Sequence, residues 1–179
     1  MIKINFDDTF EPIEVAEDFS FLTFNTTDKK GVEVLIKIQI SSLQNPLLPY
    51  VSNLAFGPLD ISGKMNDSAQ IYHQNKAKVF STILFFCLAF LQQNSHITIG
   101  LDGSNEVRAY LYHRMFLKNK EYLEDYFIAI GVDWYVRLLR NNDVERDSNG
   151  YPFFKPKPEP FNYSRVNDLY RYYIFHLRQ

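Results

Sequence analysis

The stretch FSFLTFNTTDKKGVEVLIKIQI, residues 19–40, carries the clearest structural pattern of the chain. Apolar and polar side chains alternate over 19–26 and again over 32–40, which is the period of a β-strand with one buried face. The turn-forming segment 28–31 separates the two runs and ends in a glycine. These residues therefore predict a β-hairpin. The side chains expected on its buried face are Val32, Val34, Ile36, Ile38 and Ile40.

Outside the hairpin, the strongest signal is a helix over residues 69–93. Its second half is apolar nearly all round, and the apolar run 79–91 is too short for a membrane span, which needs about 20 residues. A helix of this kind is buried at the centre of a protein. The other expected strands are 2–6, 50–56, 96–101, 127–132 and 172–177, with a terminal helix over 169–179 as the alternative to the last strand.

A second helix is expected over 104–118, beginning at Ser104, with a further helical segment over 120–126. Because the strands come in a block before helices and strands alternate, the order predicts an α+β fold with a largely antiparallel sheet. The long central helix would cross one face of that sheet and the second helix would pack on it. We expect a single domain over 1–179, with a proline-rich surface excursion at 141–160.

The composition excludes several classes of protein. Only one cysteine is present among 179 residues, so neither an internal disulfide nor a cysteine zinc cluster can form, and Cys87 is expected to be a buried, inert thiol. The four histidines lack metal-ligand spacing, and no glycine-rich phosphate loop occurs. We therefore expect no metal and no cofactor. The first eight residues do not resemble a signal peptide, so a cytoplasmic protein without a membrane segment is expected.

Charge is distributed unevenly, although the net charge is only −2. Residues 1–35 carry eight acids against three lysines, whereas residues 151–179 carry five bases against two acids. Such an asymmetry indicates either a binding surface or two chain ends that lie together and neutralise each other.

The segment 102–114 has the richest set of polar side chains, at a point where a strand leads into a helix. Backbone N–H groups at a helix start favour anions, so Gly103 and Ser104 are candidate binding residues. Arg108 and Tyr112 stand one helical turn apart on one face, where they could hold a phosphate and a base. His113 is a candidate acid or base near neutral pH. Ser104 is equally well explained as a helix cap, and Arg108 as half of an ion pair.

The C-terminal segment 161–179 interleaves tyrosines with arginines. This composition suits single-stranded nucleic acid, which binds by charge and stacking, and it also suits protein interfaces. The third interpretation is a tyrosine-rich strand packed on the sheet.

Four short motifs resemble a family of short uncharacterised bacterial proteins of the Bacteroidota type. The motifs are NLAFG at 53–57, NKAKV at 75–79, GS-x-x-VR-x-x-LYHR at 103–114 and FIAIG at 127–131. The resemblance covers about residues 20–135, and it departs from the family pattern at Pro58 and in the longer segment 141–160. It implies no established reaction. The positions that match the family pattern at the second helix are Gly103, Ser104, Arg108, Tyr112 and Arg114.

Three functions follow as hypotheses, and the sequence does not decide whether the protein is an enzyme. The first is an interaction module of a two-gene toxin–antitoxin or phage-defence system, which binds a partner protein or a second copy of itself. The second is a toxin-like enzyme acting on RNA or nucleotides through Arg108, Tyr112, His113 and Arg114, with His113 and Arg108 catalytic. The third is a domain that binds a small molecule in a cavity under the long helix.

Overall fold

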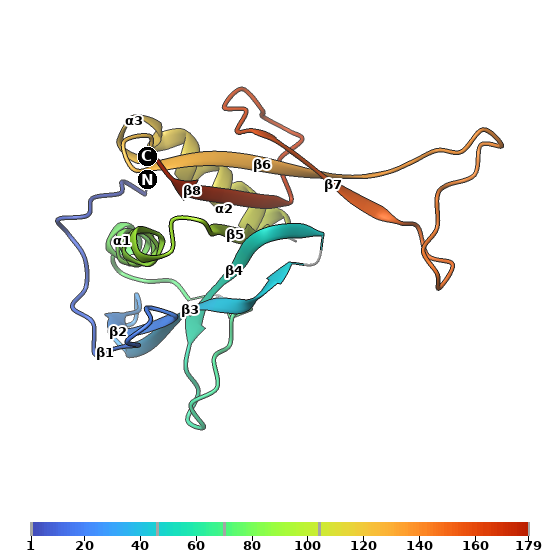
Figure 1. Ribbon diagram of the computed structural model, residues 1–179. Coiled ribbons are helices and arrows are strands. Elements are labelled where there is room, and N and C mark those ends of the chain that lie inside the picture. Colours follow the sequence, from blue (N-terminus) through green and yellow to red (C-terminus); the bar gives the residue numbers. More distant parts are fainter. Residues whose placement is uncertain (1, 46, 70, 104, 179) are drawn as a thin grey trace.

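The computed structural model describes residues 2–45, 47–69, 71–103 and 105–178. Its strands are β1 (Glu14–Val15), β2 (Phe21–Thr27), β3 (Glu33–Asn45), β4 (Leu48–Pro58), β5 (Thr98–Asp102), β6 (Phe127–Val136), β7 (Phe154–Pro160) and β8 (Tyr172–Leu177). Its helices are α1 (Lys76–Gln93), α2 (Glu106–Lys118) and α3 (Lys120–Leu123). Figure 1 shows these elements along the chain.

The eight strands form one sheet in the order β1-β2-β3-β4-β5-β8-β6-β7. Neighbouring strands are antiparallel except β4 and β5, which run parallel. The predicted α+β fold with a largely antiparallel sheet is therefore confirmed. Because β8 lies between β5 and β6, the last segment is a strand and not a terminal helix.

The predicted hairpin is formed by β2 and β3, which pair from Phe21↔Gln39 to Thr27↔Glu33. Gly31 has a φ angle of +83° in the turn, a conformation that glycine adopts at no steric cost. The expected inward face is correct for Ile36, Ile38 and Ile40, which are buried. Val32 is exposed instead, because it precedes the first residue of β3 and lies in the turn.

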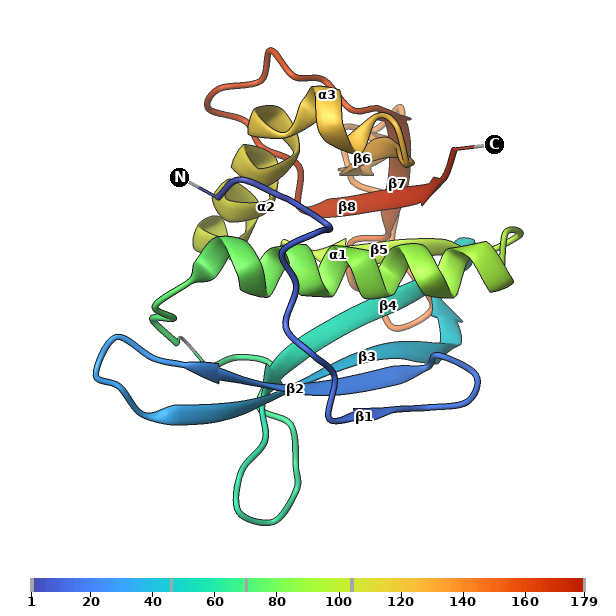
Figure 2. The ribbon, with the colours of Figure 1, turned by 90° about the vertical axis from the view of Figure 1, so that its left-hand side faces the viewer.

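The sheet curves around α1, which Figures 1 and 2 show on its concave side with β2 and β3 below it and β8 above it. Ile83, Cys87 and Leu91 repeat every four residues and are almost fully buried, as expected for a central helix. The helix is less completely enclosed than predicted, because Phe85 is 46% exposed.

Helix α1 begins at Lys76 and not at residue 69. The side chain of Asn75 accepts a hydrogen bond from the backbone N–H of Lys78 and so caps the helix. Before the cap the chain is extended, because Gln74 donates its N–H to the carbonyl of Thr27, and Lys29 donates to that of Tyr72. These bonds hold the preceding residues beside the end of β2.

The N-terminal residues 2–6 do not form the predicted strand. They cross the helices as an irregular segment whose backbone N–H groups are bonded by side chains. Asn119 Oδ1 accepts from Ile4 at 2.8 Å, Ser81 Oγ accepts from Asn5 at 2.9 Å, and the Tyr122 hydroxyl accepts from Phe6 at 2.9 Å. The apolar and polar residues alternate here because Ile4 is buried against the helices, and no strand is formed.

The segment 141–160 is more ordered than the surface excursion expected from its prolines. Its second half is β7, which pairs with β6 from Ile130↔Pro160 to Val136↔Phe154. Residues 137–153 form an arm that projects from the body of the protein and forks into two turns (Figure 1).

Candidate functional site

A cavity of about 300 Å³ opens between the second half of β4, the connection 59–75, and the first turns of α1 and α2. The parallel pair β4–β5 brings these elements together, since Asp102 at the carboxyl end of β5 leads into α2 beside β4. A cavity was expected under the long helix, whereas this one lies beside the first turns of that helix and of α2. Most ligand pockets are clefts of this kind, largely apolar with a few polar groups.

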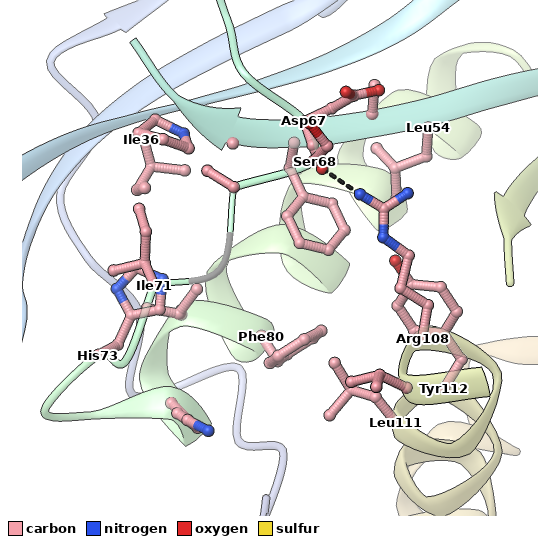
Figure 3. A pocket seen from close by; sticks show the side chains of 18 of the residues that line it. Ile36, Leu54, Asp67, Ser68, Ile71, His73, Phe80, Arg108, Leu111 and Tyr112 are labelled. Atoms are coloured by element: carbon pink, nitrogen blue, oxygen red, sulfur yellow. Dashed lines mark hydrogen bonds between the residues drawn. The ribbon is translucent and has the colours of Figure 1, made fainter. Parts of the chain in front are cut away.

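The cavity wall is mainly apolar. The residues that form this wall are Ile36, Leu54, Phe56, Ile71, Val79, Phe80, Leu111 and Tyr112. Figure 3 shows Phe80 and Leu111 facing each other, with Ile71 on the opposite side of the space. The rings of Phe56 and Phe80 meet edge to face with their centroids 5.9 Å apart, so this part of the wall has a fixed shape.

Arg108 provides the main positive charge at the cavity rim. Its guanidinium donates a hydrogen bond to the backbone carbonyl of Asp67 (Figure 3). Among the described residues Arg108 forms no ion pair, although Asp67 and Asp102 also line the cavity. A guanidinium has five N–H donors, so donors are left for a ligand.

Tyr112 lies one turn beyond Arg108 and also lines the cavity, as the helical spacing predicted. Burial raises the pKa of Tyr112 to about 12, so its phenol is protonated at neutral pH and can donate a hydrogen bond. Its ring packs edge to face on Tyr173, with the centroids 5.9 Å apart. The ring is therefore fixed by the core of the protein.

The start of α2 differs from the expected anion site. The helix cap is Asn105, whose side chain accepts from the backbone N–H of Arg108 at 2.9 Å, and the predicted cap Ser104 lies outside the described residues. The N–H of Gly103 donates to the carbonyl of Arg171 at 2.9 Å. This bond continues the pairing of β5 and β8 by one residue, so the N–H of Gly103 has a partner already.

His113 and Arg114 lie away from the cavity. His113 is 2% exposed, and its ring lies 5.1 Å from that of Phe161, with no hydrogen-bond partner at either ring nitrogen. Burial holds the pKa of His113 below its ordinary value. The guanidinium of Arg114 lies over the ring of Tyr110, at 5.7 Å from its centroid. The structure therefore brings Arg108 and Tyr112 together, without the other two residues of the predicted catalytic group.

The sequence did not indicate the half of the site that comes from β4 and the connection 59–75. Within the NLAFG motif, Gly57 is the residue that could have indicated this half of the site. A Cβ atom at this position would lie 2.2 Å from the backbone oxygen of Asn66. Only glycine lets the connection cross β4 so closely. His73 also lines the cavity, and its buried Nδ1 atom has no hydrogen-bond partner.

Of the three interpretations of the tyrosine-rich C-terminal segment, the strand is nearest, although residues 172–177 form β8 within the sheet and do not pack on its face. Tyr170, Tyr172 and Tyr173 are buried, so their rings are not available for stacking on bases. Arg165 pairs with Asp133 at 2.6 Å and with Glu159 at 2.9 Å. These carboxylates raise the pKa of Arg165 further above its ordinary value.

The two oppositely charged chain ends do not neutralise each other in the part of the chain that the structure describes. At the N-terminal end, Asp8 pairs with Lys78 of α1 at 3.1 Å. At the C-terminal end, Arg165 pairs with neighbours on β6 and β7. The acids of residues 11–18 therefore lie on the surface without an ion pair among the described residues.

The described residues contain no group of three histidine, cysteine, aspartate or glutamate side chains placed to hold a metal ion. None of their helices combines the length and the apolar character that crossing a membrane requires.

Comparison with known proteins found a family but no individual relative. No curated protein and no solved structure matches the chain. The model of a family of unknown function, DUF6934, matches residues 8–147. This range contains all the residues that line the cavity, but it ends before β7 and β8. Since β8 is bonded to β5 on one side and to β6 on the other, residues 172–177 complete the sheet on which the matched part depends. The chain belongs to the family of unknown function DUF6934.

Proposed function

We propose that the protein binds a small organic acid with an apolar body in the cavity between β4, α1 and α2. The observation that carries this proposal is the guanidinium of Arg108, which lies without a carboxylate partner at the rim of an apolar cavity of about 300 Å³. The function corresponds to the third hypothesis from the sequence, a small-molecule binding domain.

The size and lining of the cavity support a ligand with a flat or branched apolar part. A volume of about 300 Å³ is at the lower end of the range for small-molecule pockets. Phe56, Phe80 and Leu111 would contact the apolar part, and burying it supplies about 25 cal/mol for each Å² removed from water.

The polar groups support an acidic head on the ligand. Arg108 would bind a carboxylate through two parallel hydrogen bonds, and such bidentate pairs are strong and directional. Lys76 adds a second positive charge at the rim and forms no ion pair among the residues described. The protonated hydroxyl of Tyr112 is a further donor.

Calorimetric titration with a matched pair of probes tests this proposal. Indole-3-carboxylate and indole-3-carboxamide have the same ring and nearly the same shape, but only the first carries a negative charge. We expect the acid to bind and the amide to bind at least about tenfold more weakly, because a charge-assisted hydrogen bond contributes roughly 1.5–3 kcal/mol. Equal affinities, or no heat with either probe, would contradict the proposal.

The exposed arm favours a second function, the interaction module of a two-gene toxin–antitoxin or phage-defence system. Leu138 and Tyr151, one on each turn of this arm, are 71% and 69% exposed, and large exposed apolar side chains on a projecting segment favour an interaction site. The test is co-purification of the chain with the protein encoded by the neighbouring gene. A complex that Leu138→Ser and Tyr151→Ser disrupt would support this role, and separate elution of the two proteins would refute it.

A further inference from the structure

The arm of residues 137–153 presents apolar side chains at the far end of the β6–β7 hairpin (Figure 1). The exposed members on the arm and at its base are Tyr135, Leu138, Leu139, Tyr151 and Phe154. Large apolar side chains that are exposed in one part of a protein mark interaction sites.

Backbone and side-chain bonds hold the arm in one shape. Glu145 donates its N–H to the carbonyl of Arg137 at 2.8 Å and accepts from the N–H of Phe153 at 2.8 Å, so it joins the two turns of the fork. Its carboxylate pairs with Lys155 at 2.7 Å. A surface that is ordered before binding loses little conformational entropy when a partner docks.

The outer edge of β7 is unsuited to pairing with another strand. Prolines occupy positions 156, 158 and 160, and they have no N–H group. The next odd-numbered residue, Phe161, donates its N–H toward β6, to Ala129 at 3.2 Å. The backbone groups of the even-numbered residues therefore face the outer edge. Because three of these residues are prolines, this edge has no N–H donor over 156–160. A partner must contact the arm through side chains.

The positive charges of this region are arginines on the arm and lysines at its base. Residues 137–153 carry three bases and three acids, and Lys155 and Lys157 bring 137–157 to five bases against three acids. Arg146 and Lys155 are paired within the arm, whereas Arg137 and Arg140 form no ion pair with any described residue. A complementary surface would combine acidic groups with exposed apolar side chains.

Such a surface exists at the opposite end of the same sheet. Residues 7–18 carry six acids and no base. Within this segment Ile13 and Val15 are exposed, at 59% and 38%, beside Glu11, Glu14 and Glu17. Strand β1 is first in the sheet and β7 is last, so the arm and this acidic segment lie at opposite edges.

We infer that the arm docks on the acidic segment 11–18 of a second copy of this chain. Because the two surfaces differ, the contact joins copies head to tail, and it forms either a ring or an open chain. Leu138 and Tyr151 would pack on Ile13 and Val15, while Arg137 and Arg140 would lie against the glutamates. The contact is independent of ligand binding in the cavity.

Sedimentation velocity with charge-reversed chains tests this inference. One chain carries Arg137→Glu and Arg140→Glu, and the other carries Glu14→Arg and Glu17→Arg. The arm of the first chain then becomes acidic, and segment 11–18 of the second chain carries two acids and two bases, so each chain alone should associate at least about tenfold more weakly than the original protein. An equimolar mixture should associate again, because the unchanged arm of the second chain meets the unchanged acidic segment of the first.

Ile61→Ser is the control variant. It removes a fully exposed isoleucine from a different loop and should leave association unchanged. The original protein should associate more weakly at high salt, which screens exposed charges. A single-chain mass at every concentration would overturn the inference. Association that the reversals at Glu14 and Glu17 leave intact would overturn it too, since the arm would then dock elsewhere.

Discussion

The guanidinium of Arg108 on α2 donates a hydrogen bond to the backbone carbonyl of Asp67, a residue 41 positions earlier in the chain. This bond attaches the connection between β4 and α1 to the first turn of α2, and the candidate cavity lies between them. Arg108 therefore closes one side of the cavity and places a positive charge at its rim. The proposed binding of an organic acid depends on both roles.

Replacing this arginine should separate binding from stability. Arg108→Gln removes the charge and is expected to weaken indole-3-carboxylate binding at least about tenfold, while the loss of its exposed bond to Asp67 should cost no more than about 1.5–3 kcal/mol of folding free energy. Fluorescence titration and urea unfolding measure the two effects. Arg114→Gln on the same helix, outside the cavity, is the matched control and should bind normally. If both variants lost the same binding affinity, the loss would not come from the charge of Arg108 at the cavity, and the prediction would be wrong.

The buried imidazole of His113 should make stability depend on pH. Burial lowers its pKa from the ordinary value of 6.5, so below that pH the unfolded chain binds more protons than the folded one. The free energy of unfolding should therefore reach its full value above about pH 6.5 and fall as the pH decreases. Urea unfolding between neutral and mildly acidic pH measures the slope.

His113→Phe should reduce this dependence, because the replacement ring stays beside Phe161 and cannot be protonated. The slope that remains belongs to other groups such as His73, whose pKa burial also lowers. His96→Gln, at an exposed position, keeps the imidazole of His113 and should keep the slope. A slope that His113→Phe leaves unchanged would assign the pH dependence to other groups.

Asn119 should contribute more to stability than any exposed asparagine. It is 6% exposed, accepts from the N–H of Ile4 at 2.8 Å and donates to the carbonyl of Met115 at 2.8 Å. Asn119→Ala leaves a buried N–H without a partner, so we expect a loss of about 2–3 kcal/mol in the free energy of unfolding. Asn149→Ala on the arm should cost less than about 0.5 kcal/mol. A similar cost at both positions in urea unfolding would refute this role of Asn119.

Periodic patterns explain which parts of the fold could be predicted. The hairpin and α1 have regular repeats over many residues, so their type was recognised although the start of α1 was not. The N-terminal segment also alternates, yet its hydrogen bonds come from Ser81, Asn119 and Tyr122, which are more than 70 positions away. No local pattern distinguishes such a segment from a strand.

The candidate site was predicted in part for a similar reason. Arg108 and Tyr112 are four residues apart and share a helix face, which the sequence shows directly. His113 and Arg114 follow Tyr112 by one and two residues, so they point to other sides of the helix. The β4 half of the cavity depends on the close approach of Asn66 to Gly57, which only the folded chain reveals.

Chemical-shift mapping by NMR is the most direct test of the central claim, that the cavity binds an organic acid. Titration with indole-3-carboxylate should shift the backbone resonances of the lining residues, among them Ala55, Phe80 and Leu111, and leave those of the arm unchanged. The carboxamide should produce shifts only at higher concentration. Shifts that gather on the arm or the acidic segment, or none at millimolar probe, would contradict the claim.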